Sequence, residues 1–336
     1  MTQPSLFGQL DKPACVVLFS GGGGACEGIR RAVGAPVLMA VNHDPASIRM
    51  HAANHPETLH IQEDVWSVVP RQAARGRKPW LLWMSPACTH FSRAKGSGRL
   101  SEQSRSLADV AFPWIESARP AVIVLENVLE FQDWGPLDEK GRPVRHLQGA
   151  YFRAWVDRVR SYGYTVDWRP LSACDFGAPT VRKRLYLVAR CDGHPIRWPV
   201  PTFGPGAQPY RTAAECIDWS MPGSPIDGRS VPLCARTRAR IDEARRRYGE
   251  RCIVAYYGSE RDGQGIDEPL RTVTTKDRFG IVMGDTFRML TPRECARAMG
   301  FPEDYRLEGT RAQQIARIGN AVCPPVAEAI VRALGG

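Results

Sequence analysis

A cysteine and several cations stand together after an apolar segment early in the sequence. Cys88 follows the apolar run 80–84 and lies in the polar segment 85–92. The residues after it include four cations, namely Arg93, Lys95, Arg99 and Arg105. Cations favour the thiolate form, so a cysteine in this position is placed as a nucleophile. A buried structural cysteine is the alternative, and it is the more common role for a cysteine taken at random.

Glu126 stands directly after a second apolar run, residues 121–125. A carboxyl group at the end of a buried strand is expected to have a raised pKa, because burial disfavours the charged form. Such a group can donate a proton or a hydrogen bond, for example to a ring nitrogen of a substrate. The alternative is a structural salt bridge, with Arg182 or Arg184 as the partner.

Consecutive glycines at positions 21–24 follow Ser20 and the apolar run 14–19. Because glycine has no side chain, this backbone can approach a ligand closely. A phosphate-binding loop would require Gly-Lys-Ser/Thr, and no register of residues 20–28 gives a strict G-x-G-x-x-G. The glycines therefore favour a nucleotide-like cofactor other than an obvious nucleoside triphosphate or dinucleotide. A structural turn explains them nearly as well.

Polar residues also follow other predicted strand ends. Asn42, His43 and Asp44 come after the run 36–41, and Asp64 lies in the segment 62–65. A carboxylate at Asp64 could accept a hydrogen bond from an adenine amino group, or it could cap the next helix. Taken alone, Asp64 is better explained as a cap.

The elements that must position these residues are short apolar runs that alternate with helical stretches. The runs predict strands at 14–19, 36–41, 80–84, 121–125, 164–171 and 184–189, and the stretches predict helices at 26–33, 45–54, 107–118 and 151–162. This alternation predicts an α/β fold with a mostly parallel sheet and helices on both faces. Ligands of such sheets lie at the carboxyl ends of the strands, which is where the candidate residues converge.

The pattern changes near residue 191. From there to about residue 284, prolines and glycines are frequent and strands no longer alternate with helices, which predicts a separate small domain or a large insertion. Residues 229–251 hold eight arginines against three acids, and this stretch is either a solvated helix or a surface that faces nucleic acid. After residue 288 the pattern is helical again, and residues 318–333 form a closing element.

Composition narrows the class of protein. The 336 residues carry 45 Lys and Arg against 35 Asp and Glu, and a net charge of +10 favours polyanionic partners such as nucleic acid. Residues 1–12 do not resemble a signal peptide, and no apolar run reaches the roughly 18 residues of a membrane helix. Ten cysteines without a C-x-x-C pair argue against a disulfide scaffold and a zinc site. We therefore expect reduced thiols, a cytoplasmic location and no metal.

Six segments, taken in order, resemble the motifs of the C5-cytosine-specific DNA methyltransferases of bacteria and phages. They are Leu18-Phe19-Ser20-Gly21 with Gly23-Gly24; Pro86 and Cys88; Glu126-Asn127-Val128; residues 175–179 with Arg182 and Arg184; residues 290–302; and Gly319-Asn320-Ala321-Val322. They span nearly the whole chain except about 195–270, where this family keeps its target-recognition domain. Residues 272–275 resemble a short family element near the end of that domain.

The resemblance implies a Rossmann-like fold of the class I S-adenosylmethionine-dependent methyltransferases, with a smaller, irregular target-recognition domain. The implied boundaries are 1–190 for the catalytic domain, 191–285 for target recognition and 286–336 for a segment that returns to the catalytic domain. The implied partner is double-stranded DNA, with no membrane. A cognate restriction endonuclease is a second candidate partner. We expect the protein to be a monomer.

The implied reaction transfers a methyl group from S-adenosylmethionine to C5 of a cytosine that is flipped out of the duplex at a specific sequence. In this reading Cys88 adds to C6, Glu126 holds or protonates N3, Arg184 contacts O2 and Arg182 supports Cys88 or Glu126. The implied cofactor residues are Phe19, Ser20, Gly21, Gly23, Gly24, Asn42, His43, Asp44, Asp64, Val65, Pro86, Asn320 and Val322. The implied DNA-binding residues are Ser92, Arg93, Lys95, Thr272 and Thr274.

Three departures from the family pattern affect the loop of the nucleophile and the cofactor site. Ala87 and Thr89 flank Cys88 where the family has Pro and Gln, and Thr180 replaces a Gln before the arginine pair. The acid expected on the cofactor ribose is replaced by Asn42, with Asp44 two places on, so residues 42–44 all stay candidates. The rival readings are an RNA-methylating relative, a non-catalytic nucleic-acid-binding protein and a methyltransferase of exocyclic amines. The Asp/Asn-Pro-Pro-aromatic motif of that last class is missing from the sequence.

Overall fold

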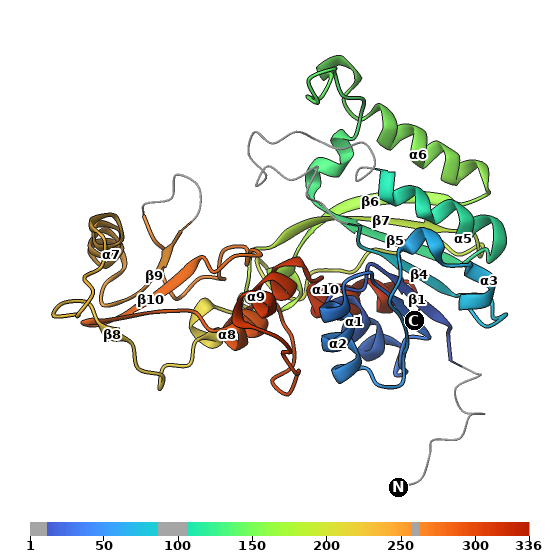
Figure 1. Ribbon diagram of the computed structural model, residues 1–336. Coiled ribbons are helices and arrows are strands. Elements are labelled where there is room, and N and C mark those ends of the chain that lie inside the picture. The colour runs from blue at the N-terminus through green and yellow to red at the C-terminus, as the bar shows by residue number, and fades with distance from the viewer. Residues whose placement is uncertain (1–11, 87–105, 257–261, 336) are drawn as a thin grey trace, which may run out of the picture. The chain divides into compact units, whose positions relative to one another are not determined.

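The computed structural model describes residues 12–86, 106–256 and 262–335 (Figure 1). The chain divides into two compact units, each described by itself below. Unit 1 comprises Met1–Leu171, Lys183–Val200 and Val326–Gly336, and unit 2 comprises Ser172–Arg182 and Pro201–Pro325. No helix within the described residues is both long enough and apolar enough to cross a membrane.

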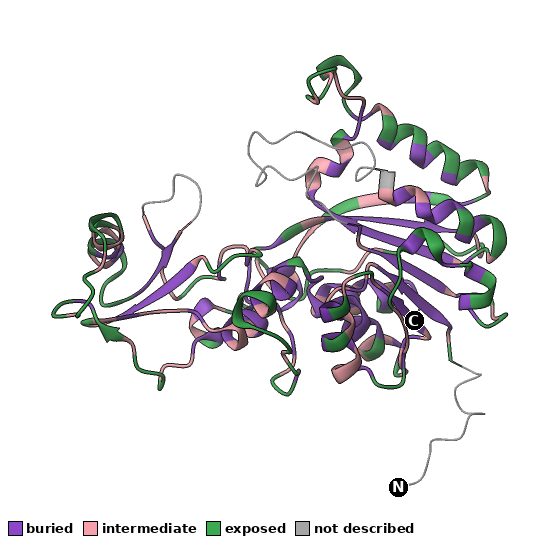
Figure 2. Ribbon diagram, viewed as in Figure 1, coloured by how far each residue is buried: buried purple, intermediate pink, exposed green. Residues whose placement is uncertain are grey.

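Unit 1 is built on a seven-stranded sheet with the order β3-β2-β1-β4-β5-β7-β6. The strands are β1 (Cys15–Leu18), β2 (Met39–Val41), β3 (Leu59–Ile61), β4 (Leu81–Met84), β5 (Val122–Asn127), β6 (Thr165–Ser172) and β7 (Lys183–Arg190). The strands β3, β2, β1, β4 and β5 run parallel, whereas β7 is antiparallel to β5. The central strands are buried on both faces, which explains their uninterrupted apolar sequences (Figure 2).

Helices cover both faces of this sheet (Figure 1). On one face lie α1 (Gly24–Val33), α2 (Pro45–Asn54) and α10 (Pro324–Ala333), and on the other lie α3 (Pro70–Ala73), α5 (Ala111–Ser117) and α6 (Ala150–Ser161). The second face is packed with large aromatic side chains: Phe112, Trp114, Phe131, Phe152 and Trp155. The predicted α/β fold with a mostly parallel, two-sided sheet is confirmed.

The parallel strands are in register at their carboxyl ends. Val41 pairs with Ile61 and with Leu18 on its two sides. Leu18 pairs in turn with Met84, and Met84 pairs with Leu125. The residues that follow these positions therefore form one row across five neighbouring strands, which are about 4.8 Å apart.

Unit 2 contains a four-stranded antiparallel sheet that the sequence analysis did not predict. Its order is β8 (Ser224–Pro225), β11 (Thr286–Met289), β10 (Phe279–Met283) and β9 (Arg251–Ala255). The arginine-rich helix α7 (Ala235–Tyr248) packs on this sheet through Ile241 and Ala244. A signal for the β10–β11 hairpin was present in the sequence, because Gly284 and Asp285 separate the apolar run 279–283 from the alternating stretch 286–290. Gly284 has a φ of 52° in the structure.

Two further helices of unit 2 are α8 (Pro292–Ala298) and α9 (Arg311–Asn320). The start of α8 is fixed by a capping box, in which the Thr291 side chain and the Glu294 carboxylate each accept a backbone hydrogen bond. Glu294 is fully buried and forms an ion pair with Arg288 at 2.7 Å. The predicted closing element 318–333 consists of the end of α9 and the helix α10, which begins at Pro324 and Pro325 after a break at residues 321–323.

Candidate active site

The strand register brings three of the predicted site residues, Phe19, Asn42 and Glu126, to one edge of the unit 1 sheet. Asn42 follows β2, Phe19 follows β1, and Ser85 opens the segment after β4. Glu126 occupies the same level within β5, because Leu125 pairs with Met84. Main-chain hydrogen bonds join neighbouring strand ends: Ser20 N donates to Val41 O at 3.0 Å, and Asn42 N donates to Ile61 O at 3.1 Å.

The glycine segment forms a sharp left-handed loop before α1. Phe19, Gly21 and Gly23 have φ values of 59°, 51° and 93°. Gly23 is the N-cap of α1 and provides no side-chain cap, so the N-terminal end of this helix faces the loop with its backbone donors. A Cβ atom at Gly21 would meet only Phe19 O, at 4.0 Å, so the loop borders open space. This geometry suits the close approach of an anionic or polar ligand.

Ser20 supplies the most direct sign that this loop fits a cofactor. Its side chain is 6% exposed, and its hydroxyl oxygen is buried without a hydrogen-bond partner. A buried hydroxyl left without a partner costs about 1–3 kcal/mol. A polar ligand group beside the loop would satisfy this hydroxyl, so the residues present are compatible with S-adenosylmethionine.

Asn42, His43 and Asp44, the three candidates for binding the cofactor ribose, differ in their hydrogen bonds within the protein. Both carboxylate oxygens of Asp44 cap α2, accepting from Ala46 N at 3.1 Å and from Ser47 N at 3.2 Å. The Asn42 side chain accepts from Asp44 N at 2.9 Å, and His43 is exposed. Asp44 is therefore engaged at the helix terminus, whereas Asn42 remains in the row of strand ends.

Asp64 caps the short 3-10 helix Val65–Ser67, and its carboxylate accepts from Trp66 N at 3.0 Å. Val65 is buried, at 6% exposure, directly after this exposed carboxylate. The capping role that the sequence favoured is thus present. The adenine-binding role of Asp64 and Val65 stays a prediction.

Glu126 and Arg184 form an ion pair, with 3.5 Å between Oε1 and Nε. The Glu126 side chain is 8% exposed and that of Arg184 is 17% exposed. The pair arises from the antiparallel β5–β7 ladder, in which Glu126 lies opposite Tyr186. The predicted salt bridge is therefore present, with Arg184 as the partner. A carboxylate beside a guanidinium can bind the polar edge of a planar base, with one group accepting and the other donating.

Asn127 anchors the segment that leads to the predicted nucleophile. Its Nδ2 donates to Pro86 O at 3.2 Å, and its Oδ1 accepts from Val128 N at 2.8 Å. Ser85 is held as well, because its hydroxyl accepts from Trp83 Nε1 at 3.0 Å. The sequence analysis quoted Asn127 as part of a motif but missed this anchoring role. The predicted residues Cys88, Ser92, Arg93 and Lys95 lie outside the described residues.

Most cysteines in the described part of the chain are unsuited to nucleophilic attack. Burial raises the pKa of Cys15 and Cys216 to about 12 and that of Cys174 and Cys252 to about 11. Cys234 is exposed, and a hydrogen bond from the Thr237 side chain lowers its pKa. Cys234 is therefore the described thiol that an experiment on Cys88 must control for.

Two of the predicted motifs meet within unit 2 at Gly319. A Cβ atom at this position would lie 2.2 Å from Thr274 O, so only glycine allows α9 to pack on residues 272–275. Asn320 is exposed at the end of α9, and Val322 is buried. The Thr274 hydroxyl donates to Lys276 O at 3.1 Å, and Thr272 is half-buried.

Arg182 is buried against the segment 272–275 of unit 2, with 5% of its surface exposed. Its NH1 donates to Val273 O at 3.4 Å. The adjoining backbone is paired as well, since Val181 N donates to Leu270 O at 2.9 Å. Arg182 is thus tied to the segment that contains Thr272 and Thr274, and Arg184 to Glu126.

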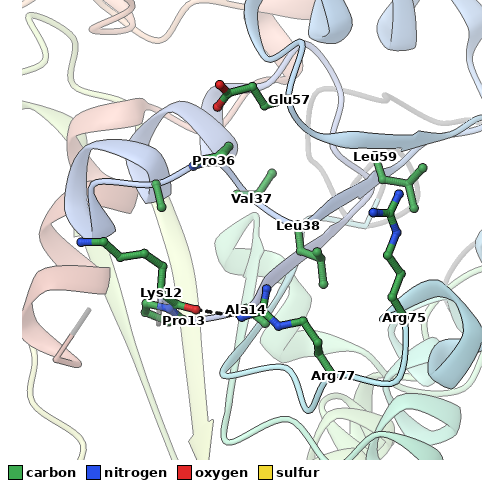
Figure 3. A pocket seen from close by; sticks show the side chains of 11 residues that line it. Lys12, Pro13, Ala14, Pro36, Val37, Leu38, Glu57, Leu59, Arg75 and Arg77 are labelled. Carbon is green, nitrogen blue, oxygen red and sulfur yellow. Dashed lines mark hydrogen bonds between the residues drawn. The ribbon is translucent and has the colours of Figure 1, made fainter. Parts of the chain in front are cut away.

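A hollow of about 80 Å³ lies away from the row of strand ends (Figure 3). Its lining includes residues at the amino ends of β1, β2 and β3, with three cations, Lys12, Arg75 and Arg77, and one carboxylate, Glu57. Because the candidate residues gather at the carboxyl ends of the same strands, this hollow lies at the opposite edge of the sheet.

Comparison with known proteins agrees with this geometry. The family model described as C-5 cytosine-specific DNA methylase matches residues 14–204 and 225–336. The Type II methyltransferase M1.HphI of Haemophilus parahaemolyticus is 26% identical over 340 residues, which cover 94% of this chain and 85% of that protein. M.AplI of Arthrospira platensis, also a Type II methyltransferase, is 26% identical over 94% of this chain and 84% of its own.

Solved structures are similar in fold. A proposed DNA modification methyltransferase encoded within an E. coli prophage has a TM-score of 0.69 at 20% identity, covering 96% of this chain and 98% of its own. DNMT2 of Spodoptera frugiperda has a TM-score of 0.63 at 17% identity, covering 96% of this chain and all 100% of its own. The resemblance seen in the six sequence segments is confirmed by the family match, which covers most of the chain. The protein therefore belongs to the C-5 cytosine-specific DNA methylase family and is a DNA cytosine-5-methyltransferase.

Proposed function

We propose that the protein transfers the methyl group of S-adenosylmethionine to C5 of a flipped cytosine in a specific sequence of double-stranded DNA, through a covalent bond between Cys88 and C6. The observation that carries this proposal is the Glu126–Arg184 pair, 3.5 Å apart at the strand level of the glycine loop. This pair presents an acceptor and a donor to the edge of a base that has a ring nitrogen, an exocyclic amine and a carbonyl oxygen.

In the proposed reaction the Cys88 sulfur forms a bond to C6, and the electron pair of the C5–C6 double bond moves onto C5. Glu126 holds the proton at N3 as negative charge develops on the ring, and Arg184 donates to O2. The cofactor, when bound, supplies an electrophilic methyl group to C5. A base, water included, then removes the C5 proton, and the Cys88 thiolate leaves as the double bond reforms.

The placement of Cys88 rests on its neighbours in the chain. Pro86 is held by Asn127 at the end of β4, and Cys88 follows Pro86 by two residues. The buried cysteines of the described part of the chain have raised pKa values, which makes them poor competitors for this role. Arg182 would support Cys88 or Glu126, as the family resemblance implies.

For the cofactor, we propose that the backbone of Gly21, Gly23 and Gly24 and the Ser20 hydroxyl bind the methionine part. Asn42 binds the ribose, because the Asp44 oxygens already cap α2. The remaining proposed contacts are those of the family motifs, with Phe19 and Val65 against adenine, Asp64 on its amine, and Pro86, Asn320 and Val322 completing the pocket.

DNA would be contacted by Ser92, Arg93 and Lys95 and by Thr272 and Thr274, and residues 191–285 would read the sequence. Helix α7 favours the solvated reading of the arginine-rich stretch, because four of its arginines, Arg238, Arg245, Arg246 and Arg247, form ion pairs with acids. Arg246 and Arg247 both pair with Glu243, and Arg238 pairs with Asp227. We therefore do not assign α7 to base reading.

The Type II names of the relatives support a restriction–modification setting with a cognate endonuclease. We further propose that the protein acts as a monomer in the cytoplasm of a bacterial or phage-infected cell.

Nucleoside mass spectrometry tests the function. Unmethylated double-stranded DNA and transfer RNA are each incubated with the protein and S-adenosylmethionine, digested and analysed. We expect 5-methylcytosine in the DNA and none in the RNA, and sequencing the DNA product then gives the recognition site. Methylation of the RNA alone, or of an exocyclic amine in DNA, would contradict the proposal.

A further inference from the structure

Arg240 in helix α7 is a cation that has no acidic partner in the described part of the chain. Four other arginines of the same helix do form ion pairs with acids. The Arg240 side chain is half-buried, and its Nε atom is buried without a hydrogen-bond partner. Arg240 is therefore packed against the protein rather than freely solvated, and no described carboxylate pairs with its charge.

Arg240 packs on Tyr256, the residue that follows β9. Its guanidinium carbon lies 5.2 Å from the centroid of the Tyr256 ring, which is within the roughly 6 Å of a cation–π contact. Arg278 holds the main chain of the same residue, because Tyr256 N donates to Arg278 O at 2.8 Å and Arg278 NH1 donates to Tyr256 O at 2.7 Å. Two guanidinium groups thus lie against one residue, and within the described residues Arg278 forms no ion pair either.

The acidic residues that stand nearest to these two cations in the sequence pair with other arginines. Asp242 pairs with Arg238, Glu243 pairs with Arg246 and Arg247, and Asp277 pairs with Arg311. The described part of the chain therefore supplies no carboxylate for Arg240 or Arg278.

Arg236 adds a third cation of the same kind. It is exposed, lies one turn before Arg240 on the same face of α7 and forms no ion pair with the described residues. Like charges at this spacing repel each other and destabilise a helix. The first turn of α7 contains no acidic residue that would offset the repulsion. A bound anion would remove this cost, so the charges of this face favour an anionic ligand.

The chemistry of these groups favours phosphate as that anion. A guanidinium group has only hydrogen-bond donors, and its planar fork matches the oxygens of a phosphate. A phosphate group in DNA has only acceptors, whereas most base edges present donors as well. Duplex DNA carries one negative charge per about 1.7 Å of helix axis, so it offers phosphates to several cations at once.

We propose that Arg240 and Arg278 bind the phosphate backbone of the DNA, and that Tyr256 is a positioning residue that holds Arg240 for this contact. This proposal rests on the proposed DNA substrate. It predicts a contribution to DNA binding that depends on salt and does not depend on sequence. Arg246 is the matched control, because it lies in the same helix but is exposed and paired with Glu243.

The test measures binding of the full chain to two unmethylated duplexes, one with the recognition site and one without it, by fluorescence anisotropy at a series of salt concentrations. We expect Arg240→Gln to raise the Kd of both duplexes about tenfold, the effect of a lost charge-assisted hydrogen bond. The slope of log Kd against log salt should fall by about 0.9, which corresponds to one phosphate contact. Arg246→Gln should keep the wild-type Kd and slope.

Two variants of Tyr256 test its positioning role. Tyr256→Leu removes the ring on which Arg240 packs, so it should weaken the binding of both duplexes and lower the salt slope although no charge is lost. Tyr256→Phe keeps the ring and should restore the wild-type values. Unchanged binding in Tyr256→Leu would overturn the positioning role.

The outcomes separate the inference from the function on which it rests. Wild-type salt slopes in both Arg240→Gln and Arg278→Gln, or an equal loss in Arg246→Gln, would overturn the phosphate contact. A loss confined to the duplex with the recognition site would overturn it too, because such a loss indicates base reading. If Arg240→Gln does not fold, Arg278→Gln replaces it in the same comparison. A wild-type protein that fails to bind DNA would refute the proposed substrate instead.

Discussion

At the scale of single residues, Glu126 and Arg184 are the pair whose geometry bears most directly on chemistry. Both side chains are largely buried and their atoms lie 3.5 Å apart. A charged pair in such a place is costly to desolvate, so it is more readily explained by a ligand than by stability. A bound cytosine edge would give each group a further hydrogen bond and offset that cost.

Replacing Glu126 by glutamine should slow methyl transfer without weakening cofactor binding. The amide keeps the shape of the side chain but cannot hold or deliver a proton at N3. We expect kcat to fall by roughly 10²–10⁴, the range typical of a lost acid–base group. Glu57→Gln is the control, because Glu57 is exposed at the opposite edge of the sheet (Figure 3). A near-normal rate for Glu126→Gln would remove Glu126 from the mechanism.

At the scale of residues, the sequence identifies candidate site residues but does not show which of them bind the cofactor and which only cap helices. Asp44 and Asp64 were both proposed as cofactor residues, and both carboxylates cap helices. The sequence does not distinguish a carboxylate that caps a helix from one that binds a cofactor, because both accept hydrogen bonds at the end of a strand. The contact of Asn127 could not be predicted from the sequence, because its partner is a backbone oxygen 41 residues away in the chain.

At the scale of elements, Gly319 allows α9 to approach residues 272–275. Replacing Gly319 by alanine should therefore lower the free energy of unfolding. Glycine to alanine inside a helix normally stabilises a protein by roughly 0.5–1 kcal/mol. Here the added Cβ would lie 2.2 Å from Thr274 O, so α9 must shift. We expect a loss of about 1–3 kcal/mol in the free energy of unfolding, measured in urea. Stabilisation by Gly319→Ala would contradict this packing.

Buried His55, which lies in a cluster with His51 and His60, predicts a loss of stability in acid. The pKa of His55 is lowered to about 4 in the folded protein, mainly by burial, so below about pH 6.5 the unfolded chain binds protons more readily. Stability from this residue is therefore complete above pH 6.5 and declines as the pH falls towards 4, by up to about 3 kcal/mol. Urea unfolding at a series of pH values measures this decline, and it should be smaller in His55→Gln. An identical pH dependence in the variant would show that His55 is not its source.

The sequence predicts the elements of unit 1 well, and the reason is physical. Strands buried on both faces need continuous apolar residues, so β1, β4 and β5 are visible as short apolar runs. The sheet of unit 2 was missed, because frequent prolines and glycines in residues 191–284 obscure the strand pattern, and β8 has only two residues. The pair Gly284-Asp285 between β10 and β11 was the signal that could have revealed it.

At the scale of the whole molecule, the two units divide the predicted motifs between them. Unit 1 holds the glycine loop, Asn42, Glu126 and Arg184, and unit 2 holds Arg182, residues 272–275 and the Gly319–Val322 motif. The net charge of +10 favours a polyanionic partner, which agrees with the proposed DNA substrate. Under the proposed function, variants at the motifs of either unit should lower turnover.

The most direct test of the account is to trap the covalent bond between Cys88 and the base. Once the recognition sequence is known, a duplex carrying 5-fluorocytosine at the target position is incubated with the protein and S-adenosylmethionine. Fluorine at C5 cannot be removed as a proton, so elimination of Cys88 is blocked after methyl transfer. Intact mass spectrometry and peptide mapping then locate the bond.

Wild-type protein and Cys234→Ser should both give a protein–DNA species with one added methyl group, attached at Cys88. Cys234→Ser is the control because Cys234 is the exposed thiol with a lowered pKa. Cys88→Ser should give no such species while still binding the cofactor. A wild-type enzyme that methylates cytosine without forming the adduct, or an adduct that persists in Cys88→Ser, would contradict the covalent mechanism.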